Sequence, residues 1–204
     1  MIYLGYDYIN KYQLVISYLI QNAIETGYAV PHIEKEIAYS QVITEFENSD
    51  VTLIAFSSCE KTYSSIFENN AFKKVDEFGL FGWIGYAYIY LFLEKCVTFE
   101  SLFMIFPIDE MIKKYPVYHE MDIRQLEDDF NYLTRYSLLD AIMKHKGIST
   151  TELSNMTGVP FATISSLRFG KRDIDKVEFK TVNKIAKALN IKPDSLTKLE
   201  LIKN

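Results

Sequence analysis

The sequence predicts an all-α protein in which an N-terminal helical domain precedes a five-helix bundle. Three observations support this prediction. Apolar residues recur at helical spacing along most of the 204-residue chain. Glycine and proline stand where the predicted helices end or begin. Hydrophobic residues make up 49% of the chain and aromatic residues 15%, which is enough to build well-packed cores.

The charge of the chain changes sign at one point. Residues 1–136 hold 10 Lys/Arg and 20 Asp/Glu, a net charge of −10. Residues 137–204 hold 12 Lys/Arg and 7 Asp/Glu, a net charge of +5. We therefore predict two domains, 1–136 and 137–204. The second is the candidate for binding a polyanion.

Helical periodicity dominates the N-terminal domain. One amphipathic helix is expected over Leu14–Ile24 and a second, opened by Pro31, over Ile33–Phe46. Periodicity cannot separate a strand from a helix for the short apolar run 51–56, although we favour a helix. Ser57 or Ser58, followed by Glu60, suits the N-cap of a helix that runs through Phe67.

An apolar run of 16 residues, 78–93, is the longest in the chain. It is shorter than the roughly 20 residues that span a bilayer, so we predict a buried helix and no membrane segment. Gly79, Gly82 and Gly85 are spaced three apart and are expected to allow close helix packing. The acidic segment 121–136 predicts a connecting helix capped by Asp122 and running close to, or into, the next helix.

Residues with catalytic or metal-binding chemistry are sparse in the N-terminal domain. Cys59 and Cys96 form no CxxC pair, and no secretory signal opens the chain, so a reducing cytoplasmic setting is expected. His119, Glu120 and Asp122 match no metal-ligand spacing. We predict no catalytic residues, no metal and no cofactor, and we do not expect an enzyme.

The C-terminal domain carries clear helix start and stop signals. A first helix from Ser137 ends before Gly147. Ser149 and Glu152 form a capping box for a second, which ends at Gly158. A third helix is expected over 160–169, a fourth over 179–189 and a short fifth from Pro193, so that the bundle extends to about residue 201.

The segment GISTTELSNMTGVPFATISSLRFGKRDI, followed by TVNKIAKALNIKPDSL, resembles the Cro-like, or Xre-type, helix-turn-helix family of phage repressors, bacterial regulators and antitoxins. The resemblance covers about a third of the chain and implies a lambda-repressor-like bundle that reads the DNA major groove with helix 160–169. It places Phe161, Ala162, Thr163 and Ser166 toward the groove. Residues 1–136 resemble no family known to us.

Two positions depart from the pattern of the family. Thr150 replaces a common glutamine, and Arg168 replaces a common glutamate. Phe161 and Ala162 lack the hydrogen-bonding groups that read guanine or adenine, but they suit thymine methyl groups. Modest specificity and strong salt dependence are expected. The resemblance implies DNA contacts by Thr150, Thr151, Phe161, Ala162, Thr163, Ser165, Ser166, Arg168, Lys171 and Arg172.

Four hypotheses about function follow. The first is a homodimeric, sequence-specific transcriptional regulator of repressor type that binds double-stranded DNA. In it, the acidic domain over residues 1–136 dimerises, binds an effector or holds a partner protein. In the second, an antitoxin or phage-type control protein, the acidic domain neutralises a basic partner. The third is an enzyme fused to a DNA-binding module, which ranks lower. In the last, the C-terminal bundle contacts only protein, and Phe161 and Phe169 are buried against the N-terminal domain.

Overall fold

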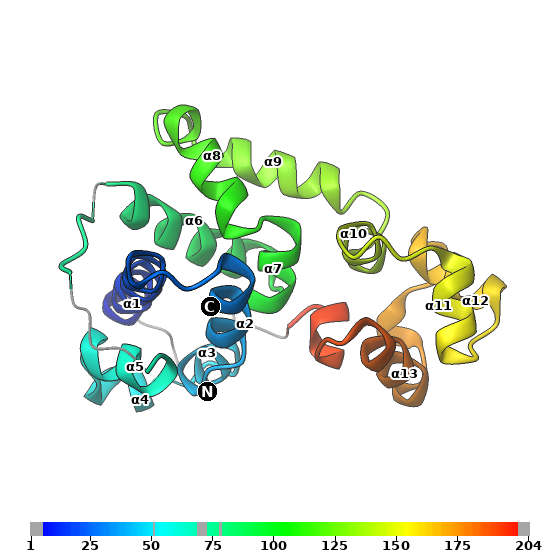
Figure 1. The fold of residues 1–204 in the computed structure, drawn as a ribbon. Coiled ribbons are helices and arrows are strands. Elements are labelled where there is room, and N and C mark those ends of the chain that lie inside the picture. The colour runs from blue at the N-terminus through cyan, green and yellow to red at the C-terminus, as the bar shows by residue number, and fades with distance from the viewer. Residues whose placement is uncertain (1–5, 51, 69–72, 78, 200–204) are drawn as a thin grey trace.

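The computed structural model describes residues 6–50, 52–68, 73–77 and 79–199. Every regular element among them is helical, which confirms the predicted fold class. Parts of several predicted segments, namely residues 51, 78 and 200–204, lie outside the described residues. Figure 1 shows helices α1–α9 gathered on one side, with α10 and the remaining C-terminal elements beside them.

The N-terminal helices have the bounds α1 Tyr6–Thr26, α2 Val30–Ala38, α3 Gln41–Glu47, α4 Thr52–Phe56, α5 Cys59–Ile66, α6 Leu80–Lys95, α7 Phe99–Ile105, α8 Ile108–Tyr118 and α9 Arg124–Leu133. The C-terminal elements are α10 Leu138–His145, α11 Thr150–Thr157, α12 Phe161–Arg168, the 3₁₀ turn η1 Ile174–Lys176, α13 Phe179–Leu189 and the 3₁₀ turn η2 Pro193–Leu196.

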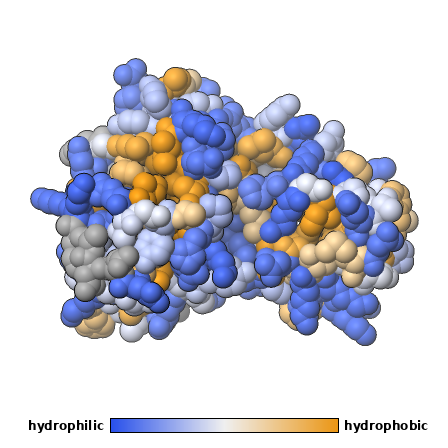
Figure 2. All heavy atoms as spheres, in the orientation of Figure 1, coloured by the Kyte–Doolittle hydropathy of each residue, from blue (hydrophilic) through white to orange (hydrophobic). Residues whose placement is uncertain are grey.

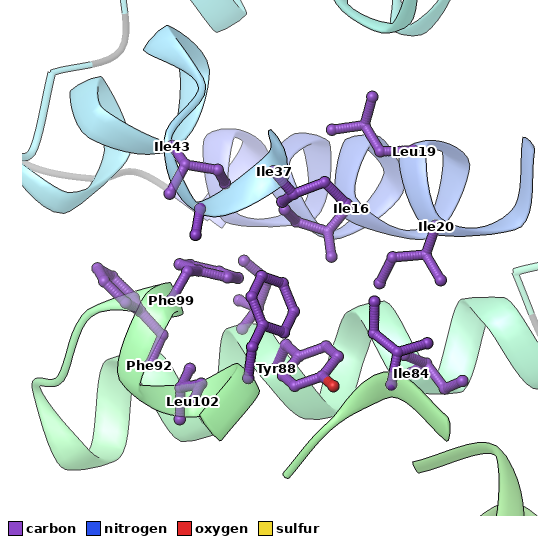
Figure 3. Close-up of a cluster of buried hydrophobic side chains, with 14 of the residues drawn as sticks. Ile16, Leu19, Ile20, Ile37, Ile43, Ile84, Tyr88, Phe92, Phe99 and Leu102 are labelled. Atoms are coloured by element: carbon purple, nitrogen blue, oxygen red, sulfur yellow. The ribbon is translucent and has the colours of Figure 1, made fainter. Parts of the chain in front are cut away.

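Helices α1 and α6 form the centre of the N-terminal core. Figure 3 shows the α1 side chains Ile16 and Ile20 next to Ile84 and Tyr88 of α6. Gly85 lets the two helices approach, because a Cβ atom there would lie only 2.7 Å from the Gln13 carbonyl oxygen and would overlap the Ser17 hydroxyl. Close packing is therefore confirmed at Gly85.

The other two glycines of the run have different neighbours. A Cβ atom on Gly82 would overlap the backbone of Glu77, in the segment that precedes α6. Gly79 is the N-cap residue of α6. The apolar run forms the largely buried helix α6, as predicted. No helix among the described residues has the length and apolarity needed to cross a membrane.

Three glutamates of α2 and α3 cap other helices by accepting hydrogen bonds from backbone N–H groups. Glu34 Oε1 accepts from Ile108 N at the start of α8, at 2.7 Å. Glu45 Oε2 accepts from Leu53 N in α4 at 2.9 Å. Glu47 Oε1 accepts from Phe99 N in α7 at 2.7 Å. Each carboxylate satisfies an N–H group that its helix leaves free, so the acidity of this domain is partly structural.

Several predicted elements need correction. The expected second helix is divided into α2 and α3, because Ser40 takes an extended conformation and its hydroxyl accepts a hydrogen bond from Ile43 N. Helix α9 begins at Arg124, and Asp122 accepts from the Arg124 N–H group at 3.0 Å. The connecting helix ends at Leu133 and does not continue into α10. The predicted fifth helix of the C-terminal bundle is the 3₁₀ turn η2. The favoured helix is confirmed over the described residues 52–56, and so is the Ser58 cap.

A second hydrophobic cluster lies within the C-terminal elements. It is built around Leu139, Ile142, Leu153, Ile164 and Ile185, all nearly or fully buried. In the view of Figure 2, apolar residues gather over the N-terminal helices and again over the C-terminal bundle, with polar residues between these areas. The two clusters meet at α10, where Ala141 belongs to the N-terminal cluster and Leu139 and Ile142 belong to this one.

The two parts are joined by a buried polar network around Glu100 of α7. Glu100 is only 6% exposed. Its Oε2 accepts from Ser195 Oγ at 2.6 Å and from Lys192 N at 2.9 Å, and its Oε1 accepts from Tyr39 Oη at 2.6 Å. Ser101 Oγ donates to the Ser195 carbonyl oxygen at 2.6 Å. Buried hydrogen bonds of this kind hold η2 against the N-terminal helices.

Candidate nucleic-acid interface

The turn between α11 and α12 is fixed by local hydrogen bonds. Ser149 Oγ accepts from Glu152 N at 3.2 Å, and Glu152 Oε2 accepts from Ser149 N at 2.7 Å, so the predicted capping box is formed. Gly158 ends α11 with φ of 68°, a conformation that glycine adopts at low cost. Ser154 Oγ then donates to the Val159 carbonyl oxygen at 2.7 Å, which directs the chain into α12.

Helix α12 presents two different faces. Ile164 and Leu167 are buried in the C-terminal core and fix the orientation of the helix. Phe161 and Ala162 lie exposed, while Thr163, Ser165 and Ser166 are partly exposed. The helix is one residue shorter at each end than predicted, with Pro160 as its N-cap and Phe169 as its C-cap.

The exposure of Phe161 tests the burial that the protein-contact hypothesis predicts. Phe161 is 55% exposed and Phe169 is 42% exposed. Phe169 makes an edge-on contact with the ring of Tyr136, with centroids 5.7 Å apart. Burial of both rings against the N-terminal helices, which was part of the protein-contact hypothesis, is therefore not found. The candidate groove-facing side of α12 is accessible.

Lys171 and Arg172 continue this accessible surface beyond α12. Both side chains are exposed, and both backbone N–H groups donate to the Ser166 carbonyl oxygen, at 2.9 and 3.1 Å. Asp173 follows directly and accepts from Asp175 N at 3.1 Å, where η1 begins. The two cations are thus held beside the end of α12, and the carboxylate next to them caps the following turn.

Residues 139–200 match the family model of the Cro/C1-type HTH DNA-binding domain. These residues form a Cro/C1-type helix-turn-helix (HTH) domain. The match agrees with the resemblance seen in the sequence, and it supports a DNA-binding regulator. No family model matches the N-terminal region. Comparison with curated proteins and with solved structures found no match.

Arg168 of the HTH domain makes two hydrogen bonds within the protein. Its Nε donates to Asp140 Oδ1 at 2.8 Å, and its Nη1 donates to Thr150 Oγ1 at 3.0 Å. The two positions that depart from the family pattern therefore contact each other. Thr150 is largely buried, whereas the neighbouring Thr151 is exposed at the start of α11. Contacts of these residues with DNA stay predictions.

Asp140 is the centre of this arrangement and was not foreseen from the sequence. Its side chain is 1% exposed and also contacts Lys144 Nζ at 2.6 Å. Burial alone would raise the pKa of Asp140, but hydrogen bonds from Lys144 and Arg168 outweigh it and the pKa lies below its ordinary value. The available signal was a single acidic residue, three positions after the Ser137 cap, within the otherwise apolar run of residues 138–143.

The backbone also ties the start of the HTH domain to the end of α12. Ser137 Oγ accepts from Asp140 N at 3.0 Å and donates to the Arg168 carbonyl oxygen at 2.7 Å. Gly170 has φ of 66°, and its Cα lies so close to the Tyr136 carbonyl oxygen that a Cβ atom would overlap it. The C-terminal end of α12 is therefore positioned by the residues that enter α10.

The other candidate residues of the N-terminal part have structural partners. Ser58 Oγ accepts from Lys61 N at 3.3 Å as the cap of α5. His119 Nδ1 lies 2.6 Å from the Tyr115 carbonyl oxygen. Burial raises the pKa of the Cys59 thiol, which disfavours the reactive thiolate. Within the described residues, no group of three His, Cys, Asp or Glu side chains is arranged to hold a metal ion.

Proposed function

We propose that the protein is a sequence-specific transcriptional regulator of repressor type, acting in the cytoplasm as a homodimer on double-stranded DNA. The observation that supports this most strongly is the accessible face of α12, carrying Phe161 and Ala162, inside a Cro/C1-type HTH domain. We further propose 136/137 as the domain boundary, supported by the change of core and of charge.

Each part of the surface has a distinct proposed task. Phe161 and Ala162 contact thymine methyl groups, and Thr163, Ser165 and Ser166 form single hydrogen bonds to base edges or phosphates. Thr151, Lys171 and Arg172 bind phosphates, as does the Thr150 end of α11. Arg168 is held between Asp140 and Thr150 by its two hydrogen bonds. From there it lies beside the phosphates that the end of α12 and the start of α11 are proposed to bind.

Selection from a pool of randomised duplexes by the full-length protein tests sequence specificity. We expect thymine-containing half-sites related by two-fold symmetry, with centres about one helical turn, roughly 34–36 Å, apart. Phe161→Ala is expected to lose the enriched thymines and to keep non-specific affinity. Lys187→Ala, on the exposed side of α13, is the control and is expected to select the wild-type sequence. A pool that stays random after selection would refute sequence-specific recognition.

The second proposal is an antitoxin or phage-type control protein, and the net charge of −10 over residues 1–136 favours it. In that case, the acidic domain neutralises a basic protein while the HTH domain represses the shared operon. Co-expression with the products of neighbouring genes, followed by purification, tests it. Stable co-purification with a basic partner supports this function, and isolation of the protein as a homodimer alone counts against it.

A further inference from the structure

A cavity of about 830 Å³ lies between the N-terminal helices and α10 of the HTH domain. Its walls come from α2, from the α7–α8 corner, from the end of α9 and from α10. Met104, Ile105 and Ala141 supply an apolar surface. A second cavity of about 340 Å³ adjoins it and shares Pro31, Glu34, Met104 and His145. This volume and mixed lining are typical of sites for small molecules, which bury most of their surface in such a cleft.

The charge of the lining is predominantly negative. Glu34, Asp109 and Glu110 place three carboxylates on the side formed by α2 and α8. Lys113 contacts Glu110 Oε1 at 2.7 Å and Asp109 Oδ2 at 3.5 Å from the exposed side of α8. The Glu34 carboxylate accepts a hydrogen bond from the Ile108 backbone N–H group. Burial raises the pKa of Glu34 to about 7, which reflects a carboxylate in poor contact with water.

The cations on the opposite wall do not balance these carboxylates. Lys144 is engaged by Asp140 at 2.6 Å. Burial, and then the charge of Lys146, lower the pKa of His145, which favours the neutral imidazole. A cation entering the cavity therefore meets Glu34 on one side, together with Asp109 and Glu110, whose charges Lys113 partly offsets. On the other side it meets apolar side chains.

We propose that this cavity binds a small organic cation: an amine whose ammonium group lies against Glu34 and Asp109 and whose apolar body covers Met104 and Ala141. The occupant touches α10, the helix that also carries Asp140 and thereby holds Arg168 at the end of α12. Occupancy is thus coupled to the position of α12. This coupling rests on the proposed DNA-binding function, but the binding of the amine does not.

Three probes that share one ring test the charge preference. Titration calorimetry on the full-length protein at pH 8 compares 2-phenylethylamine, 2-phenylethanol and phenylacetate. We expect the amine to bind at least tenfold more tightly than the alcohol, and the carboxylate to bind no better than the alcohol. Equal affinities for amine and alcohol, or no detectable binding of the amine, would overturn the proposal.

Two variants locate the site. Glu34→Gln keeps an oxygen acceptor for Ile108 N and removes the charge, so the affinity for the amine is expected to fall about tenfold. Ala141→Leu fills the apolar side and is expected to abolish binding. Glu45→Gln is the matched control, because Glu45 caps α4 in the same way outside this cavity, and it should bind like the wild type. Wild-type affinity in both test variants would place the ligand elsewhere and refute the site.

Measuring DNA affinity with and without the amine separates the proposed ligand site from the proposed regulatory function. Saturating 2-phenylethylamine is expected to change the DNA affinity of the wild type at least threefold and that of Glu34→Gln much less. If the amine binds but DNA never does, the ligand site stands and the regulator function fails. If DNA binds but its affinity is insensitive to bound amine, the coupling is refuted.

Discussion

Removing the charge of Asp140 is expected to destabilise the HTH domain. Asp140→Asn preserves the shape of the side chain but leaves Arg168 and Lys144 without their carboxylate. Loss of one partner of a fully buried ion pair costs about 3–5 kcal/mol. Because Arg168 is 18% exposed and Lys144 reaches solvent, water replaces part of the interaction and we expect about 2–3 kcal/mol.

Urea denaturation of the full-length protein, followed by circular dichroism, measures this loss in the free energy of unfolding. A double-mutant cycle with Asp140→Asn, Arg168→Met and the double variant isolates the pair itself, and we expect a coupling energy of about 1–2 kcal/mol. Asp109→Asn is the control, because Asp109 and Lys113 form an exposed pair worth less than about 1 kcal/mol. A cost below about 0.5 kcal/mol for Asp140→Asn, with no coupling to Arg168, would refute this reasoning.

The same ion pair has a predicted pH dependence. Folding lowers the pKa of Asp140. Its contribution to the free energy of unfolding is therefore present above the ordinary pKa of an aspartate and is lost as the pH falls through the pKa of Asp140 in the folded protein. The difference in stability between wild type and Asp140→Asn should therefore be constant from pH 5 to pH 7 and shrink in strong acid. A difference that persists unchanged at low pH would indicate a cause other than charge.

Three further predictions concern the core, a buried cap and base recognition. Gly85→Ala is expected to cost about 2–3 kcal/mol in thermal or urea unfolding, because the new methyl group meets the Gln13 backbone; a cost near zero would contradict the close packing. Burial raises the pKa of Glu47 to about 7. The favourable contribution of Glu47 to the free energy of unfolding is therefore complete below the pKa that it has in the unfolded chain and is lost as the pH rises through 7. Glu47→Gln should therefore flatten the decline in stability between pH 5 and 8, by up to about 3 kcal/mol, and an unchanged slope would exclude Glu47 as its source. Replacing a contacted thymine by uracil should weaken wild-type DNA binding about fourfold, or about 0.8 kcal/mol per methyl group, but not that of Phe161→Ala; equal losses would argue against the Phe161 contact.

Local signals in the sequence predicted most of the HTH domain correctly. The Ser149 capping box, the left-handed Gly158 and the buried Ile164 and Leu167 depend on residues close together in the chain, and each has a strong positional preference. The break at Ser40 was missed although serine is a good N-cap, because the apolar periodicity continues through it. Periodicity detects the buried face of a helix but is insensitive to a short interruption.

Contacts between segments that lie far apart in the sequence could not be predicted from it. Nothing near Glu100 indicates that its carboxylate receives the Ser195 hydroxyl, 95 residues away. Likewise, the resemblance implied a DNA contact for Arg168, which stays a prediction, but gave no sign of its hydrogen bond to Asp140, which depends on how α10 crosses α12. The cavity beside α10 combines α2, α8 and α10, whose proximity no local pattern encodes.

The salt dependence of DNA binding tests the central claim most directly. The affinity of the full-length protein for the DNA upstream of its own gene should fall steeply with salt concentration, because phosphate contacts release bound counterions. Lys171→Ala/Arg172→Ala should reduce the slope of log K against log salt by about 2, and Lys187→Ala should leave it unchanged. No binding at low salt, or the same slope in the Lys171/Arg172 variant and the wild type, would contradict the account.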